Sequence, residues 1–215
     1  MSWRPRSLCL GLAMEKTDCH RKLLEVGTQL FSERGLHGVS IRELSLAAGT
    51  SISMISYHFG SKEGLYSAVL KQQFACFAEI HEIRQRVTDP VDMVESYLRW
   101  TFKRHRNNPY LLRFYTSELT NPTAFFETLV LPVIDEVIVI MAQAIEEGVL
   151  QKKFREDVDP TNAALALAGM VNYFFLSSLA TEKLISHSPE RDEELVQQYL
   201  DIFIHGVSAQ VAGSH

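Results

Sequence analysis

The sequence predicts an all-α fold in two parts, a small N-terminal domain and a larger C-terminal one. Apolar residues recur at helical spacing from Thr17 onward, and no convincing strand alternation interrupts them. Glycines and prolines divide this pattern at intervals that suit helix ends. The apolar fraction is 46% and the charged fraction 22%, as in a globular protein with a packed core. We expect about nine or ten helices.

The N-terminal residues stand outside the helical pattern. Arg4 and Arg6 precede the short apolar run "LCLGLA", an arrangement that resembles the start of a signal peptide. The run is short, and no A-x-A cleavage pattern follows it. We therefore interpret residues 1–16 as a disordered or mis-annotated extension, with Met14 as the initiator. The predicted domains are then residues 17–66 and 67–215.

The first two predicted helices have clear end signals. The first one ends at Gly35, a residue that tolerates the left-handed conformation after a helix. Ser40 and Glu43 form a capping box at the start of the second helix, because each can bond the backbone amide of the other. That helix ends at "AAG", residues 47–49. The first helix carries an apolar stripe made by Leu23, Gly27, Leu30 and Phe31.

Two further helices follow closely. Ser51 is the expected N-cap of a third helix, which Gly60 stops. Ser61 is the expected N-cap of a fourth, with Glu63 favourably placed in its first turn. The pattern predicts that this fourth helix continues from Lys62 into the mid-80s.

Prolines divide the rest of the chain. Five of these prolines lie at or near an expected helix start, where the missing N–H costs little. Pro132 lies inside an apolar helical run and should kink or divide it. The prolines at the expected helix starts are Pro90, Pro109, Pro122, Pro160 and Pro189.

The second and third helices, joined by a glycine turn, predict a helix-turn-helix. The short second helix of such a motif exposes small or polar side chains to base edges in the major groove. Ile55 and Phe59, four residues apart, would face inward, while Ile52 and Met54 could touch thymine methyl groups. The candidate DNA-binding residues are Ser40, Arg42, Ser51, Ile52, Ser53, Met54, Ser56, Tyr57, His58 and Lys62.

The run from Leu23 to Leu65 resembles the DNA-binding region of the TetR family of bacterial transcriptional repressors. The resemblance rests on ordered elements: "LF" at 30–31, Gly35, Gly38, "SIREL" at 40–44, "AG" at 48–49, "YHF" at 57–59 and "KEGL" at 62–65. It implies a recognition helix from Ser51 to His58 and a homodimer. It also implies that the last two long helices, about 161–183 and 190–209, form the dimer interface, and that the body binds a small-molecule effector.

The charge distribution favours a dimer as well. Residues 1–66 carry eight Lys and Arg against six Asp and Glu, and residues 67–215 carry thirteen against twenty. One module with so few cations neutralises few phosphates, so its affinity for DNA should be poor. Two modules held together would overcome this through effective concentration.

The body contains many aromatic residues mixed with a few polar ones, as small-molecule sites do. Ordinary core packing is the alternative explanation for each of them. No cofactor loop and no metal-ligand spacing is apparent, and three cysteines without ligand spacing indicate a reduced, cytoplasmic protein. The candidate effector-binding residues are Tyr97, Trp100, Thr101, His105, Arg113, Phe114, Glu118, Phe126, Asn172 and Tyr173.

Three other interpretations remain open at this point. Residues 161–180 are apolar enough to read as a membrane helix, although Asn172 and two serines interrupt them, and we expect a buried helix instead. An all-α enzyme could use His105 and Glu118 as acid and base. A helical interaction or ligand-binding protein could have lost DNA binding. The expected function is a repressor that binds a near-palindromic operator as a dimer and is released by a small molecule.

Overall fold

The computed structural model describes the backbone of residues 7–208 and the side chains of residues 18–208. Within these residues the chain is helical, and its one β-contact is an isolated bridge between Phe154 and Ser208. The chain divides into two compact units. Unit 1 comprises the residues up to Phe74 together with Arg113–Leu129, and unit 2 comprises Ala75–Leu112 and the residues from Val130 onward. The prediction placed the domain boundary after residue 66 and did not assign residues 113–129 to the first domain.

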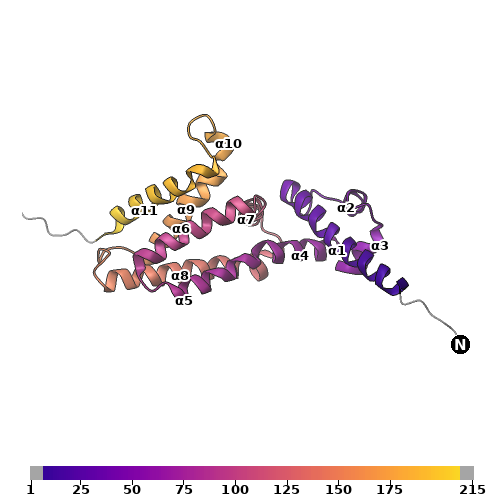
Figure 1. Cartoon of the computed structure of the whole chain (residues 1–215), viewed down its shortest axis with the longest axis horizontal. Helices are drawn as coiled ribbons and strands as arrows, with labels where there is room; N and C mark the ends of the chain where they lie inside the picture. Colours follow the sequence, from indigo (N-terminus) through magenta and orange to yellow (C-terminus); the bar gives the residue numbers. More distant parts are fainter. Residues whose placement is uncertain (1–6, 209–215) are drawn as a thin grey trace, which may run out of the picture. The chain divides into compact units, whose positions relative to one another are not determined.

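Unit 1 contains α1 (Ser7–Arg34), α2 (Ile41–Ala47), α3 (Ile52–Phe59), α4 (Lys62–Phe74) and most of α7 (Leu111–Thr120), shown in Figure 1. Residues 7–16, part of the segment predicted to be a disordered or mis-annotated extension, are helical and continue α1 toward the N-terminus. Their sequence contains neither proline nor a turn signal after Pro5, so helical hydrogen bonding can extend through them. Residues 1–6 lie outside the described residues.

The predicted capping box is present at the start of α2. The Ser40 hydroxyl accepts from the Glu43 amide at 3.2 Å, and the Ser40 amide donates to Glu43 Oε2 at 2.8 Å. Arg34 Nη1 donates to the other carboxylate oxygen of Glu43 at 2.8 Å. The Arg34 guanidinium, followed by the Ser40 backbone, lowers the pKa of Glu43 to about 2. Gly35, which ends α1, has the expected positive φ of 68°.

The ends of α3 follow the sequence signals with one exception. Gly60 stops the helix at a φ of 78°, and the Ser61 hydroxyl accepts from the Gly64 amide at 3.1 Å at the start of α4. Ser51 is the N-cap residue by position, but its side chain makes no capping bond. Its hydroxyl lies 2.7 Å from the Ser53 hydroxyl instead.

The expected long fourth helix is interrupted. α4 ends at Phe74, a 3-10 turn covers Ala75–Ala78, and α5 follows as Glu79–Arg86. Arg104 Nη2 donates to the Cys76 carbonyl oxygen at 2.8 Å. A side chain therefore bonds a backbone carbonyl within the 3-10 turn that separates α4 from α5. The same guanidinium pairs with Glu79 at 2.6 Å, at the start of α5.

A polar network lies in the interior of unit 1. Glu118 on α7 is fully buried, and its Oε1 accepts from the Tyr66 hydroxyl at 2.6 Å. Its carboxylate also accepts from the Thr123 amide at 3.1 Å and from the Thr123 hydroxyl. Aromatic rings surround Tyr66, with Phe31 at 5.0 Å and Phe114 at 6.2 Å between centroids. Burial and the neighbouring Glu118 raise the pKa of Tyr66, so the phenol remains a hydrogen-bond donor.

Unit 2 is built from α5, α6 (Pro90–Asn107), α8 (Leu131–Leu150), α9 (Pro160–Leu176), α10 (Ser178–Thr181) and α11 (Asp192–Val207). α6 and α9 begin with the predicted prolines, and Asp89 and Asp159 cap them. Pro132 divides its apolar run as predicted, because a π-helical stretch, Phe126–Val130, precedes α8.

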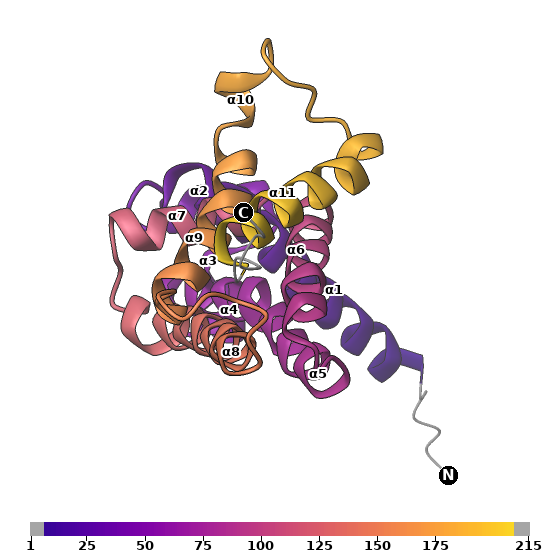
Figure 2. The same ribbon diagram turned by 90° about the vertical axis from the view of Figure 1, so that its left-hand side faces the viewer.

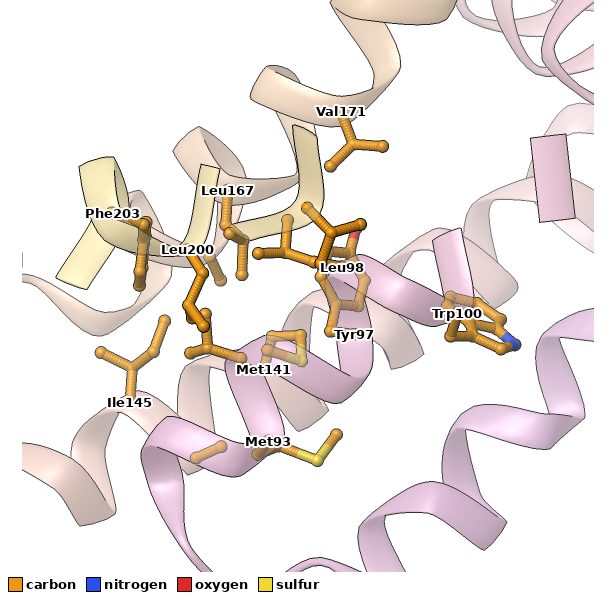
Figure 3. Packing of buried hydrophobic residues seen from close by; sticks show 14 of the residues in the cluster. Met93, Tyr97, Leu98, Trp100, Met141, Ile145, Leu167, Val171, Leu200 and Phe203 are labelled. Carbon is orange, nitrogen blue, oxygen red and sulfur yellow. The ribbon is translucent and has the colours of Figure 1, made fainter. Parts of the chain in front are cut away.

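Side chains from α6, α8, α9 and α11 meet in the core of unit 2 (Figure 3). Trp100 lies to one side of this cluster, and its ring centroid is 5.5 Å from that of Phe77. The labelled core residues in the figure are Met93, Tyr97, Leu98, Met141, Ile145, Leu167, Val171, Leu200 and Phe203.

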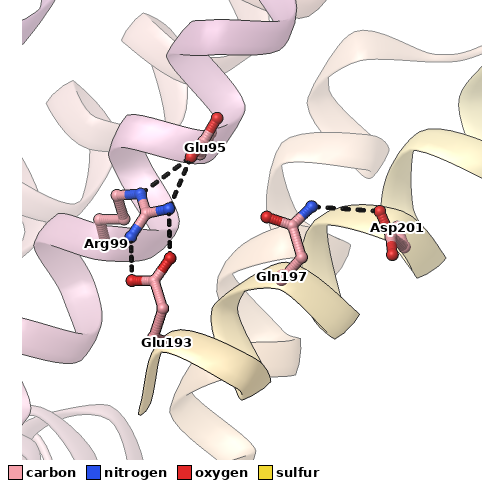
Figure 4. A network of polar contacts seen from close by, with 5 residues as sticks. All are labelled: Glu95, Arg99, Glu193, Gln197 and Asp201. Atoms are coloured by element: carbon pink, nitrogen blue, oxygen red, sulfur yellow. Dashed lines mark hydrogen bonds and ion pairs between the residues drawn. The ribbon is translucent and has the colours of Figure 1, made fainter.

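Ion pairs fasten α11 to α6 at the surface of this core. Arg99 on α6 binds both Glu95 on its own helix and Glu193 on α11 (Figure 4). Arg106, the last residue but one of α6, makes a bidentate contact with Asp192 at 2.7–3.1 Å. Two arginines of α6 therefore bind the first turn of α11, through Asp192 and Glu193.

The two long C-terminal helices are shorter than expected. The predicted helix at 161–183 ends at Leu176, and α10 follows as a separate turn. The Ser177 amide still bonds the Tyr173 carbonyl, whereas the Ala180 amide bonds the Ser177 carbonyl in a tighter turn. The second helix, expected at 190–209, comprises α11 after a 3-10 turn at Pro189–Arg191.

One described segment, Phe126–Leu150, is long and apolar enough to cross a membrane, with a mean hydropathy of 2.0. The core helix of a globular protein can be equally long and apolar. The inner face of α8 within this segment belongs to the core of unit 2, through Val137, Ile140, Met141, Ala144 and Ile145.

The capping box predicts that the difference in thermal stability between wild type and Glu43→Gln depends on pH. The folded-state pKa of Glu43, about 2, lies below its ordinary value of 4.5. The box therefore contributes its full stabilisation above pH 4.5 and loses it as the pH falls toward 2. We expect the thermal midpoint of Glu43→Gln to lie below that of wild type at pH 7, and the gap to narrow below pH 4.5 and nearly close at pH 2. A constant gap across this range would contradict the assignment.

The buried network predicts that Tyr66→Phe destabilises unit 1. The substitution leaves the buried Glu118 carboxylate without one hydrogen bond, a loss of about 1–3 kcal/mol. Tyr57→Phe makes the same chemical change on a ring that is 65% exposed, so it should shift stability by less than about 0.5 kcal/mol. Urea denaturation at one fixed protein concentration measures both, and equal effects would contradict the network's role.

Candidate DNA interface

The segment from α2 to α3 forms the predicted helix-turn-helix. Gly49 takes a positive φ of 63° in the turn between the helices. Its amide donates to the Leu46 carbonyl at 3.1 Å, and the Thr50 amide donates to the Ser45 carbonyl at 2.9 Å. These bonds close the C-terminus of α2, and the chain enters α3 two residues later.

α3 has one buried and one exposed face. Ile55 is fully buried, and Phe59 stacks on the His20 ring of α1 with centroids 4.7 Å apart. The opposite face consists of exposed residues at positions i, i+1, i+4 and i+5, which lie together on a helix. These residues are Ile52, Ser53, Ser56 and Tyr57.

The other predicted DNA-binding residues lie around this face. Ser51, Ser40 and Arg42 are exposed, the first before α3 and the other two at the start of α2. Met54 and His58 are half-buried. The His58 ring lies between His20 and Tyr57, with centroid distances of 5.5 and 5.0 Å.

Lys62 has a role that the sequence did not indicate. Its ammonium group donates to the carbonyl oxygens of Leu36 and Val39 at 2.9 and 3.0 Å. Two of its three donor positions therefore hold the segment between α1 and α2, rather than standing free as the expected cation. Backbone carbonyls carry no side-chain signal, so only the folded chain reveals these partners.

Six of the ten candidate effector-binding residues lie in unit 2. Tyr97, Trp100 and Thr101 are buried, and the Thr101 hydroxyl donates to the Tyr97 carbonyl at 2.8 Å, as in an ordinary core helix. His105 and Asn172, from α6 and α9, meet with Nε2 and Oδ1 2.9 Å apart. Burial lowers the pKa of His105, which favours the neutral imidazole. The sixth, Tyr173, is 68% exposed on α9.

The other four candidates lie in unit 1 and are already engaged or exposed. Phe114 is buried beside Tyr66. Glu118 is fully buried with its carboxylate bonded as described above, so it neither faces solvent nor has its polar atoms open to a ligand. Arg113 is exposed, and Phe126 is half-buried in the π-helical stretch. The ten residues therefore separate into core residues, surface residues and the pair His105–Asn172.

An apolar hollow of about 350 Å³ lies on unit 2 between α9 and α11. Small residues, Ala163, Ala166 and Gly206, leave room in it. Larger apolar side chains and the polar residues Arg155, Asp157, Asp159 and Asn162 complete its lining. No group of three or more His, Cys, Asp or Glu within the described residues could hold a metal ion.

Two family models match this chain. Residues 23–69 match the bacterial regulatory proteins of the tetR family, and residues 90–207 match a tetracyclin repressor-like C-terminal domain. The first match contains the helix-turn-helix, and the second contains most of the core of unit 2.

Curated relatives and solved structures agree with these matches. The transcriptional repressor NicS of Pseudomonas putida is 26% identical over 175 residues, which cover 80% of this chain and 82% of NicS. The repressor DhaR of Mycobacterium sp. is 23% identical over 191 residues, covering 88% of this chain and 92% of DhaR. AibR, solved in complex with isovaleryl coenzyme A and operator DNA, shares the fold at a TM-score of 0.70 and 20% identity, covering 86% of this chain and 97% of that one. This chain belongs to the TetR family of transcriptional regulators.

Proposed function

We propose that this protein is a repressor that binds a near-palindromic operator as a homodimer and is released by a small molecule. The observation that carries the proposal is the outward face of α3. It presents two serines, an isoleucine and a tyrosine to solvent while Ile55 anchors the helix from behind. Hydroxyls suit phosphates and base edges, and an exposed isoleucine suits a thymine methyl group. Ser40 and Arg42 add a hydroxyl and a cation at the start of α2.

The homodimer is supported by the outward faces of α9 and α11. Leu165 and Tyr173 on α9 and Ile202 on α11 are 52%, 68% and 63% exposed. Large exposed apolar side chains beside an apolar hollow of about 350 Å³ suit a twofold interface, in which one protomer's side chains enter the other's hollow. Such a dimer would set two α3 helices about 34–36 Å apart, one turn of DNA.

The effector part of the proposal rests on family membership and on the His105–Asn172 pair. A neutral imidazole and an amide, set beside the Phe175 ring at 4.8 Å, offer polar groups in an aromatic setting. AibR gives a precedent, because that protein was solved with both a coenzyme A ester and operator DNA. A ligand that prefers the conformation unable to bind DNA would weaken operator binding, typically by about 5–150-fold.

Two other functions have less support. An acid–base enzyme would need an available carboxylate, whereas Glu118 is enclosed by Tyr66 and Thr123. A ligand-binding protein without DNA binding would not need an exposed recognition face. A regulator that binds chromosomal operators acts in the bacterial cytoplasm, which agrees with the expected reduced cysteines.

The proposed interface predicts that Tyr57→Ala weakens operator binding. A hydrogen bond to a charged phosphate contributes about 1.5–3 kcal/mol, so its loss should raise Kd at least about tenfold. Fluorescence anisotropy with DNA from upstream of the protein's own gene measures this, with a random duplex as the competitor. Gln72→Ala, an exposed change on α4, is the matched control and should leave Kd unchanged.

The same titration at two salt concentrations distinguishes the functions. A repressor should bind its upstream DNA more tightly than the random duplex, and the affinity should fall as salt rises. Equal binding to both duplexes, or to neither, would contradict operator recognition and favour the protein without DNA binding.

The proposed dimer face predicts that Ile202→Glu dissociates the dimer. The substitution places a carboxylate in an apolar interface, where an unpaired charge is strongly unfavourable. Sedimentation equilibrium should show a rise in the dimer Kd of at least about a hundredfold. Val139→Glu, at a similarly exposed position on α8, should leave the dimer intact, and equal dissociation by both would argue against this face.

A further inference from the structure

The segment between α9 and α11, residues 177–188, leaves the body of unit 2. We refer to it as the connecting arm. It contains α10 and the loop after it, and in both Figure 1 and Figure 2 it stands away from α6 and α8. A connection between two neighbouring helices commonly needs only about 2–8 residues, so an arm of this length calls for an explanation.

The arm is held in one conformation by its own contacts. The amides of Ala180 and Thr181 bond the Ser177 carbonyl, and those of Leu184 and Ile185 bond the Thr181 carbonyl. At its base, the Thr181 hydroxyl lies 2.7 Å from His187 Nε2. The His187 ring packs on Phe174 of α9 at 4.5 Å. The arm is therefore a preformed structure, which lowers the entropy cost of docking it.

This ordered arm exposes large apolar side chains. Leu179 is 88% exposed and Leu184 is 80% exposed, and Ile185 beside them is 41% exposed. Contiguous exposed apolar groups on an ordered surface mark a site that another molecule covers. The only charged residues within the arm, Glu182 and Lys183, have opposite signs. The arm thus has no basic cluster for an anionic membrane or a nucleic acid.

The exposed apolar surface of the arm continues that of α9. Leu165, Gly169, Tyr173 and Leu176 recur at i, i+4, i+8 and i+11, which places them on one stripe of the helix. Leu176 is 54% exposed and lies directly before the arm. Leu179 follows Leu176 by three residues, so the exposed apolar residues of α9 and those of the arm adjoin along the chain.

We propose that the connecting arm of each protomer docks on the second copy of this chain and extends the dimer interface beyond α9 and α11. This inference rests on the proposed homodimer. By twofold symmetry both arms would dock at once, so Leu179 and Leu184 would be buried in both protomers.

The test measures dimerisation of the double variant Leu179→Ser/Leu184→Ser by sedimentation equilibrium. We expect the dimer Kd to rise at least about tenfold, because four leucines per dimer lose their apolar contacts. Val139→Ser, a 51% exposed position on α8, is the matched control and should leave Kd unchanged. Circular dichroism should give the same helicity for both variants, since the substituted side chains are exposed.

The outcomes separate this inference from the proposed dimer itself. An unchanged Kd for the arm variant, together with dissociation by Ile202→Glu, would overturn docking of the arm and leave the α9–α11 interface standing. An unchanged Kd for both variants would overturn both. A protein that is monomeric without any substitution would also overturn both.

Photo-cross-linking gives a readout that does not depend on the folding of a weakened variant. Leu184 is replaced by benzoyl-phenylalanine, and the purified protein is mixed with isotope-labelled wild type to form hybrid dimers. We expect cross-links between unlabelled arm peptides and labelled peptides of the partner subunit. Cross-links confined to a single protomer would show the arm folding back on its own chain and would overturn the proposal.

Discussion

The one-sided burial of α3 is the constraint on which the DNA-binding motif depends. With eight residues, α3 is too short to remain helical by itself in water. Ile55 is fully buried, as are Leu44 on α2 and Leu65 on α4, and the packing of α3 against these two helices supplies the stability that its length does not. Because a helix repeats every 3.6 residues, burying Ile55 also determines which side chains face outward. The exposed face of α3 therefore follows from its anchoring.

Polar contacts then fix the segment that leads into this motif. Six residues, 35–40, join α1 to α2, and their backbone groups need partners. Lys62 binds two carbonyls of this segment from α4, while Arg34 and Glu43 tie its ends together through the capping box. Arg34 and Glu43 flank this segment in the sequence, whereas Lys62 reaches it from α4. They hold the N-terminus of α2 and thereby the position of the turn before α3.

Sequence reasoning predicted the features whose causes are local and missed those whose causes are distant. The capping box of Ser40 requires a partner only three residues away, and Pro90 is compatible with a helix start by its own chemistry. Tyr66, by contrast, meets Glu118 from 52 residues away, and Lys62 meets carbonyls 23 and 26 residues away. No spacing rule connects such positions. The bonding partners of Glu118 and Lys62 therefore become visible only in the folded chain.

The engagement of its cations explains why one DNA-binding module needs a second. Within residues 18–66, Arg21 and Lys22 pair with Asp18, Arg34 pairs with Glu43, and Lys62 is bound to carbonyls. Arg42 is the cation in this range that enters no such contact, so one module offers little electrostatic attraction to phosphates. In the proposed function its affinity would come from shape and from hydroxyl contacts, which are weak singly. A rigid partner doubles these contacts without a second loss of translational freedom, and DNA binding thereby becomes sensitive to anything that alters the dimer.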